Sequence, residues 1–461
     1  MTFIAENTFL WQKLAVQLSV NVTLDNAIQL LQQGVKILYI QFGLHTREEN
    51  EHLLDMANQA IGTYALEMDL RKPAIGVACE LSGRSCRLKY GRKWGPVEVT
   101  PGQRIYLTSD AKYEDKKSDS IIFVTNFEKL LTTLIPGDVL NINEMQLKVC
   151  KINGKYMQCC IINDSRSSLC MFYPYDQIEN ISTDKSTKLS NINAQECLLA
   201  LKKGCRYIVI PDVENHTMIH AVDELLQFNL KGDQTIRTIA RLVTSASDNP
   251  CIKHNIQHVA GCVTQDADVV RQCKELCKAV LFEVSDIDQL PKEEIFRHVD
   301  VFITKPEIIE ALKFRLRELN QTAMSTLKPS VYPLQLEQGQ RVLCQCIEYA
   351  SNNCKANAVI FCTPKSLCEA EKLSRRSLPC PVLVTTEDED ALYYLLLRKY
   401  CFPVFVCGAK SNRQLIKYAT IYGRKFGFLK PGNFIVSGFG EHLVQGLEMR
   451  YVPDDFIVGA Q

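Results

Sequence analysis

The sequence patterns of helices and strands alternate along this chain, and the alternation is interrupted once. The first helix signal has apolar positions at helical spacing, an N-cap candidate at Thr23 or Asp25 and a Gly stop at Gly34. Signals of the two kinds then follow in turn: a buried strand at 35–42, a polar helix at 46–61 and a second strand at 73–81. Helix and strand in strict turn predict a parallel sheet that is covered by helices.

Between about Leu88 and Ile178 the pattern changes to short β-rich pieces that are separated by Gly, Pro, Asp and Asn turns. These pieces lie at 103–109, 120–126, 138–152 and 155–163. They predict a small all-β insert. From residue 193 to residue 306 the alternation of helix and strand resumes. An alternating pattern that is interrupted once predicts a (β/α)8 TIM barrel with an inserted small β-barrel domain.

A third block follows a charged helix at 306–321 and a Pro-containing stretch at 326–339. Helix and strand alternate again between 342 and 440, which predicts a separate C-terminal three-layer α/β domain. The α/β chain is therefore divided into four expected segments: barrel 1–87, insert 88–178, barrel 179–328 and C-terminal domain 329–461.

Charge and composition exclude several classes of partner. The chain has 53 basic and 52 acidic residues, and 46% of its residues are apolar. This balance is typical of a globular protein and leaves no basic surface for nucleic acid or for an anionic membrane. The amino-terminal segment carries Glu6 and Lys13 within its apolar stretch, and no run is apolar enough to span a bilayer. We expect a cytoplasmic protein without a nucleic-acid or membrane partner.

The 20 cysteines do not have the spacing of a zinc site or a disulfide framework. Cys159 and Cys160 are adjacent, and Cys273 and Cys277 lie one helical turn apart. We interpret the cysteines as reduced thiols that serve as small core side chains.

Five stretches, in order along nearly the whole chain, are similar to motifs of the pyruvate kinase family. They are 34–53, 75–88, 235–244, 422–440 and 447–454. The resemblance implies the three-domain layout described above and a cytoplasmic homotetramer. It also implies the glycolytic reaction of that family, in which a kinase (a transferase) moves a phosphoryl group from phosphoenolpyruvate to ADP with magnesium and potassium as cofactors.

The residues that this resemblance places at the cation sites have changed. The family's substrate-binding Arg corresponds to Tyr39, its Asn to Gln41 and its Ser to Gly43. The Asp and Thr that bind the monovalent cation correspond to Glu80 and Leu81. A potassium site at these positions is therefore not expected.

Arg241 and Val243 occupy two further positions of the family's active site. Arg241 stands where the family has a phosphoryl-contacting Lys, and Val243 replaces a metal-binding Glu. Val offers no oxygen to Mg²⁺. We interpret Arg241 as a retained phosphate contact, with a solvated charge at the end of a strand as the alternative. Arg87 matches a phosphate-facing residue of the family.

Two more parts of the family's site are missing. The Arg-Gly-Asp stretch that supplies a second metal ligand does not occur, and the chain passes from 255–261 almost directly to the helix at 266–276. Val284 takes the place of the catalytic Thr, which leaves Ser285 as the nearest hydroxyl. Arg241 and Ser285 are thus the only catalytic candidates, both at degenerate positions.

The family's effector loop corresponds to residues 362–368 in the C-terminal domain. Thr363, Lys365 and Ser366 are candidates for holding a phosphate, and a polar surface turn is the alternative.

These comparisons predict a pyruvate kinase family protein with weak or absent turnover, which would be a pseudoenzyme. Its expected role is scaffolding or association, as a homo-oligomer or with an active relative, without a tightly bound cofactor. Two alternatives stay open. One is a working pyruvate kinase in which Glu80 or Glu283 holds the metal. The other is a sensor that binds a phosphorylated metabolite through Arg87, Arg241 and Lys365.

Overall fold

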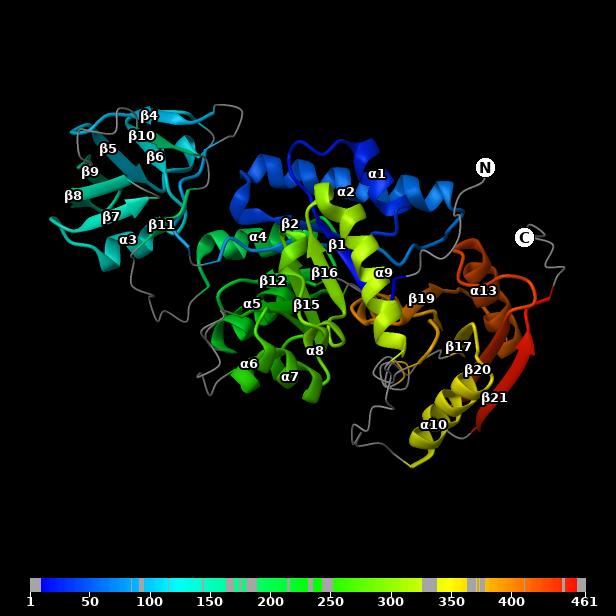
Figure 1. Ribbon diagram of the computed structural model, residues 1–461. Helices are drawn as coiled ribbons and strands as arrows, with labels where there is room; N and C mark the ends of the chain where they lie inside the picture. Colours follow the sequence, from blue (N-terminus) through cyan, green and yellow to red (C-terminus); the bar gives the residue numbers. More distant parts are fainter. Residues whose placement is uncertain are drawn as a thin grey trace.

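The computed structural model describes most of the chain. The described ranges are 10–83, 85–90, 95–114, 116–142, 145–162, 170–173, 176–179, 189–213, 216–230, 235–242, 252–325, 338–362, 370, 373, 378–409, 411–441 and 444–453. Figure 1 shows three parts: a barrel in the middle, a β-rich unit on one side of it and a C-terminal α/β unit on the other.

Eight parallel strands close into the barrel, which confirms the predicted fold class in its coarse form. Around the barrel the strands are β1 (Lys13–Gln17), β16 (Val301–Thr304), β15 (Ala279–Val284), β14 (Gly261–Val263), β13 (Arg237–Arg241), β12 (Tyr207–Ile210), β3 (Gly76–Glu80) and β2 (Ile37–Gln41). The helices of this part are α1 (Leu24–Gln32), α2 (Arg47–Glu67), α4 (Asn191–Lys202), α5 (His216–Asn229), α6 (Ile252–Gln257), α7 (Ala267–Glu275), α8 (Glu293–Phe296) and α9 (Ile309–Ser325).

Local capping explains where the first helices begin. Thr23, one of the two predicted caps, accepts a hydrogen bond from the backbone N–H of Asn26 at the start of α1. At the start of α2, Thr46 and Glu49 form a reciprocal capping box. Gly34 follows α1 with φ +97°, a left-handed conformation that glycine adopts without strain.

Side chains alternate between the inside and the outside of the barrel along each strand. Val209, Ile239 and Leu281 belong to the inner cluster, whereas their neighbours Ala240 and Val280 pack in the outer layer against the helices. Because this alternation has a period of two, the last inward position of each strand lies at the carboxyl end of the barrel.

The strands between β3 and α4 form a unit with its own core. One sheet has the order β11 (Ile178–Glu179), β7 (Val139–Ile142), β8 (Met145–Asn153), β9 (Tyr156–Ile161), β5 (Arg104–Thr108) and β6 (Ile121–Phe123), and a second pairs β10 (Cys170–Phe172) with β4 (Val97–Val99). Backbone hydrogen bonds connect Leu88 to Asp176, just before the edge strand β11, and Lys89 to Phe123 in the other edge strand, β6. The expectation of an all-β insert was too narrow, because α3 (Phe127–Thr133) also packs on this core through Phe127 and Leu130.

The C-terminal unit is a sheet with helices on both faces. Its strand order is β19 (Cys401–Phe405), β18 (Val382–Thr386), β17 (Ala358–Cys362), β20 (Phe434–Glu441) and β21 (Val444–Tyr451), with only β21 antiparallel to its neighbour in this sheet. Ile347 of α10 (Gln338–Asn353) packs on one face, with Val359. Ile416 of α13 (Asn412–Lys425) packs on the other, with Ile360.

Helix α12 (Glu389–Leu396) of this unit contacts the amino-terminal end of the barrel. The Tyr207 hydroxyl at the start of β12 donates to the backbone carbonyl of Tyr393 at 2.6 Å. Arg237 at the start of β13 forms an ion pair with Asp390. The C-terminal unit therefore covers the end of the barrel opposite to the carboxyl ends of the strands.

Two expectations from composition can be compared with the structure. Most described cysteine side chains are buried, among them Cys79, Cys262 and Cys401, as expected of thiols that pack in cores. Among the described helices, none combines the length and the apolar character that crossing a bilayer would require.

Candidate functional site

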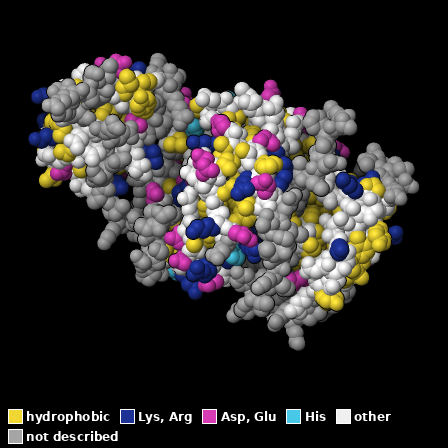
Figure 2. Space-filling model, viewed as in Figure 1, with side chains coloured by type: hydrophobic (Ala, Val, Ile, Leu, Met, Phe, Trp, Pro, Cys, Tyr) yellow, Lys and Arg dark blue, Asp and Glu magenta, His cyan; other side chains and the backbone are white. Residues whose placement is uncertain are grey.

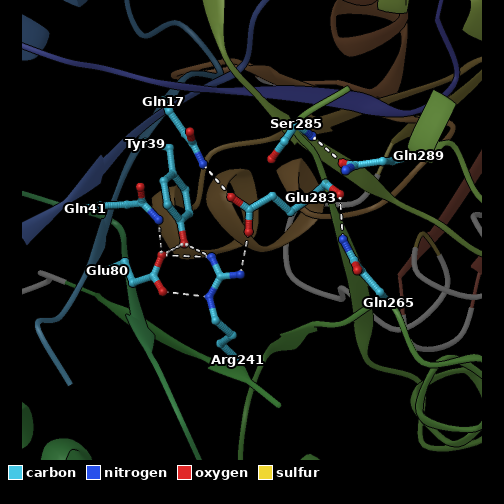
Figure 3. A network of polar contacts seen from close by, with 9 residues as sticks. All are labelled: Gln17, Tyr39, Gln41, Glu80, Arg241, Gln265, Glu283, Ser285 and Gln289. Carbon is cyan, nitrogen blue, oxygen red and sulfur yellow. Dashed lines mark hydrogen bonds and ion pairs between the residues drawn. The ribbon is translucent and has the colours of Figure 1, made fainter. Parts of the chain in front are cut away.

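Arg241, the last residue of β13, lies at the centre of a polar network at the carboxyl end of the barrel (Figure 3). Its Nε and Nη2 donate to Glu80 Oε1 and Oε2 at 2.6 and 2.8 Å. Its Nη1 donates to Glu283 Oε2 at 2.6 Å. The guanidinium thus bridges two carboxylates that come from β3 and β15, on either side of β13 in the barrel.

The Glu80 carboxylate accepts four hydrogen bonds from protein donors. Besides the two bonds from Arg241, its Oε2 accepts from the Tyr39 hydroxyl at 2.7 Å and from Gln41 Nε2 at 3.1 Å. A carboxylate has about four lone-pair sites. Its side chain is also buried, with 7% of the residue exposed. Glu80 is therefore a fixed acceptor for protein donors.

Glu283 accepts hydrogen bonds from two glutamines, one from each side of β15 in the barrel. Gln17 at the end of β1 donates to Glu283 Oε1 at 2.7 Å. The backbone carbonyl of Glu283 accepts from Gln265 Nε2 at 3.1 Å. Side chains from β1, β2, β3, β13 and β15 thus meet at one point, which Figure 3 shows as a continuous set of contacts.

The pKa shifts in this network keep the Arg241 guanidinium charged and the Tyr39 hydroxyl neutral. Burial lowers the pKa of the Arg241 guanidinium, but Tyr39, Glu80 and Glu283 outweigh burial and raise this pKa above its usual value. Burial, followed by the Glu80 carboxylate, raises the pKa of Tyr39 well above its usual value. At neutral pH the network therefore contains a neutral phenol and a permanent guanidinium.

Arg87 and Asp212 extend this network. Burial lowers the pKa of Arg87, and the carboxylates of Asp212 and Glu80 oppose this shift. Burial and then Glu80 raise the pKa of Asp212, against the effect of Arg241 and Arg87. The predicted phosphate-facing residue Arg87 is therefore within electrostatic reach of Arg241, but two carboxylates share its surroundings.

The alternative, a solvated charge at the end of a strand, does not hold, because Arg241 forms ion pairs with Glu80 and Glu283 and only 22% of its side chain is exposed. Nor is its charge free for a phosphate, because two carboxylates face one guanidinium. The same contacts bear on the alternative that Glu80 or Glu283 holds a metal. A divalent cation would have to compete with Arg241, which binds Glu80 through two N–H groups and Glu283 through a third.

Other predicted positions point away from this network or lie at its rim. Leu81 and Val284 are buried in the outer layer, so neither side chain faces the barrel mouth. Ser285 is exposed, and its backbone N–H donates to Gln289 Oε1 at 3.2 Å. A Cβ at Gly43 would lie 3.2 Å from the Cα of Ser82, so the backbone there leaves little room for a side chain.

The short connection predicted in place of the family's metal-binding loop is confirmed. Only Thr264, Gln265 and Asp266 separate β14 from α7. The Asp266 side chain accepts from the backbone N–H groups of Asp268 and Val269, which caps α7. The one carboxylate of this connection therefore serves the helix.

Four predicted residues lie outside the described part of the chain. They are Val243 after β13 and Thr363, Lys365 and Ser366 of the expected effector loop.

A cavity of about 650 Å³ lies beside the barrel, between α3 of the insert and α4. It is lined by both charges, Arg47, Lys89 and Lys129 with Glu114, Glu128 and Glu196. Lys89 is buried and forms an ion pair with Glu114 at 3.2 Å. The Glu196 carboxylate accepts from the backbone N–H of Ser82 at 2.8 Å and fixes the segment that leaves the barrel. The balance of charges gives this cavity no preference for an anion.

Neither the family models nor the curated proteins contain a match to this sequence.

Sequence reasoning identified Arg241, Glu80 and Glu283 but missed how they combine. It considered Tyr39 and Gln41 only as replacements of ligand-binding residues of the family, and it did not name Gln17, which Figure 3 shows in the network. One signal was present in the sequence. Several predicted barrel strands end in a polar residue two positions after an apolar inward residue, as in Ile239 and Arg241. Polar residues at that position of neighbouring strands are expected to meet at the mouth of a closed barrel.

Proposed function

We propose that this chain is a non-catalytic member of the pyruvate kinase family, with a role in scaffolding or association. The proposal includes the finer fold assignment, a (β/α)8 TIM barrel with an inserted small β-barrel domain and a C-terminal three-layer α/β domain, and a cytoplasmic location. It rests on the five stretches of resemblance and on one structural observation, the binding of Arg241 by Glu80 and Glu283.

The Arg241 network is unsuited to phosphoryl transfer. That reaction needs cations that neutralise the phosphoryl oxygens, and metal ions supply much of this charge. Here the cation at the barrel mouth is a guanidinium whose five donors are largely directed at protein oxygens. The carboxylates of Glu80 and Glu283 both face the guanidinium of Arg241, which leaves little of its positive charge for an anionic substrate.

A coupled assay with phosphoenolpyruvate, ADP, Mg²⁺ and K⁺ tests the missing activity. We expect turnover below about one hundredth of that of an active pyruvate kinase assayed in parallel, since loss of even one electrostatic stabiliser has about this effect. Turnover within a hundredfold of the control would contradict the proposal and favour the alternative in which Glu80 or Glu283 holds the metal.

The Glu80→Gln variant separates true turnover from contamination. If a metal on Glu80 supports any residual activity, this variant loses it, whereas the activity of a contaminating kinase is unchanged. Glu80→Gln keeps a side chain of the same size next to Tyr39 and Gln41.

The C-terminal unit has a surface that suits association. Strand β21 ends the described sheet, and an exposed edge strand can pair with another chain. Met449 and Tyr451 on β21 are 51% and 69% exposed, and Tyr349 on α10 is 73% exposed. Figure 2 shows hydrophobic side chains gathered over this unit. These residues support an oligomer that forms through the C-terminal unit.

Sedimentation velocity tests this association. We expect the unmodified protein to sediment as an oligomer and the Met449→Glu/Tyr451→Glu variant to shift toward the monomer, because buried charges would oppose the contact. Phe228→Glu on α5 is the control, since Phe228 is 90% exposed on the barrel. A monomeric unmodified protein, or an equal shift in the control, would contradict this assignment of the surface.

A further inference from the structure

Four of the chain's eight histidines gather where α5 and α6 lie side by side on the outside of the barrel (Figure 1). They are His216 and His220 on α5, His254 on α6 and His258 directly after it. The ring centroids of His216 and His254 are 4.5 Å apart, and those of His220 and His258 are 4.6 Å apart. Half of the chain's imidazoles thus belong to one cluster.

The spacing of these residues on each helix is that of a chelating pair. Both pairs are four residues apart in the chain: His216 and His220 lie one turn apart on the same face of α5, and His258 follows His254 just beyond the end of α6. Within the pairs the centroids are 5.5 Å apart for His216 and His220, and 4.6 Å apart for His254 and His258. Two such pairs on neighbouring helices present four nitrogen donors to one region of the surface.

The separations agree with those of imidazoles that share one metal ion. With metal–nitrogen bonds of about 2.0–2.1 Å, two imidazoles on a tetrahedral ion have their ring centroids about 5 Å apart. In the present side-chain positions, the described residues contain no group of three His, Cys, Asp or Glu side chains already arranged to share a metal. Rotation of exposed imidazoles takes picoseconds to nanoseconds, and His220, His254 and His258 are exposed.

The chemical state of the cluster also favours a metal. The Nδ1 of His216 is buried and has no hydrogen-bond partner among the described residues. A neutral imidazole nitrogen without a hydrogen-bond partner is the form that binds a metal. Among the described residues, the Asp223 carboxylate interacts electrostatically with His220.

We propose that His216, His220, His254 and His258 form a binding site for a divalent transition metal, with Zn²⁺ as the best-suited ion. All-nitrogen donor sets at tetrahedral spacing suit Zn²⁺, while hard ions such as Mg²⁺ prefer oxygen. The site is separate from the Arg241 network. Because α5 precedes β13 and α6 follows it, the ion would join the two helices on either side of the strand that ends at Arg241.

Isothermal titration calorimetry with Zn²⁺ alone tests the site in the full-length, reduced protein. We expect one equivalent of Zn²⁺ to bind at pH 7.5. Affinity should fall at least tenfold in His220→Gln/His258→Gln, which loses one ligand from each helix. It should also fall at pH 5.5, where protons compete for the imidazoles. His52→Gln, at an exposed histidine of α2, is the control and should bind as the unmodified protein does.

Two further measurements keep the result interpretable. Melting without metal shows whether the double variant is folded, and His254→Gln provides a second variant at an exposed ligand. Bound Co²⁺ should show visible d–d bands without the near-ultraviolet charge transfer of thiolate ligands. The proposal fails if the unmodified protein does not bind Zn²⁺. It also fails if the histidine variants bind it with unchanged affinity, which would place the ion on cysteines.

Discussion

Replacement of Arg241 by Met should lower the free energy of unfolding by about 3–5 kcal/mol, the scale on which removal of one partner breaks a buried ion pair. The variant leaves Glu80 and Glu283 without their shared cation in a region where Glu80 is 7% exposed. Met fills a similar volume, so most of the loss would come from uncompensated charge. Urea unfolding followed by circular dichroism measures it.

Two variants show whether charge causes this loss. Arg241→Met/Glu80→Gln removes one of the two stranded carboxylates and should recover part of the stability. Arg271→Met removes a cation of an exposed helical pair with Asp268 and should change stability by less than about 1 kcal/mol. If Arg241→Met costs no more than Arg271→Met, the network does not hold the barrel mouth together.

Replacement of Lys13 by Met should change how stability depends on pH. Lys13 begins β1 and is buried, with its Nζ donating to the Arg398 carbonyl at 3.1 Å and lying 3.8 Å from the centroid of the Phe402 ring. Burial lowers the pKa of Lys13 from 10.5 to about 7. The unfolded chain therefore binds a proton that the folded protein lacks above pH 7, and stability rises with pH in this range.

The expected slope from Lys13 is about 1.4 kcal/mol per pH unit, or about 2 kcal/mol between pH 7 and pH 8.5. Urea unfolding at these two pH values measures it as the difference between the unmodified protein and Lys13→Met, in which contributions of other groups cancel. The stability advantage of the variant should shrink as pH rises. Lys112→Met, at an exposed lysine, should show no such change, and a flat difference for Lys13→Met would mean that Lys13 stays protonated.

Several parts of the fold could be predicted because their signals are local. Hydrophobic periodicity indicated the helices and strands, and Thr23 marked the beginning of α1 through the cap that it forms. The change of pattern after β3 located the insert. Helix α3 was missed because its seven residues lie among strands and bury only a few side chains on a β-sheet core.

The sequence identified Arg241, Glu80 and Glu283 as candidate site residues, but it did not predict the contacts among them. Arg241 and Glu283 are 42 positions apart in the chain, and Arg241 and Glu80 are 161 apart. No local pattern connects such positions. Resemblance to a metal-dependent family directed attention to the ligands that were absent, and the contact that Arg241 makes with both carboxylates was not considered.

The sequence by itself determined the period-two alternation of each barrel strand, and hence that Glu80, Arg241 and Glu283 face inward at the strand ends. Only the tertiary structure decided that they meet, because closure of eight strands brings the ends of β3, β13 and β15 to one mouth. The same distinction between sequence and tertiary structure applies to the four clustered histidines. The four-residue spacing of each pair is written in the sequence, whereas the packing of α5 beside α6 joins the two pairs.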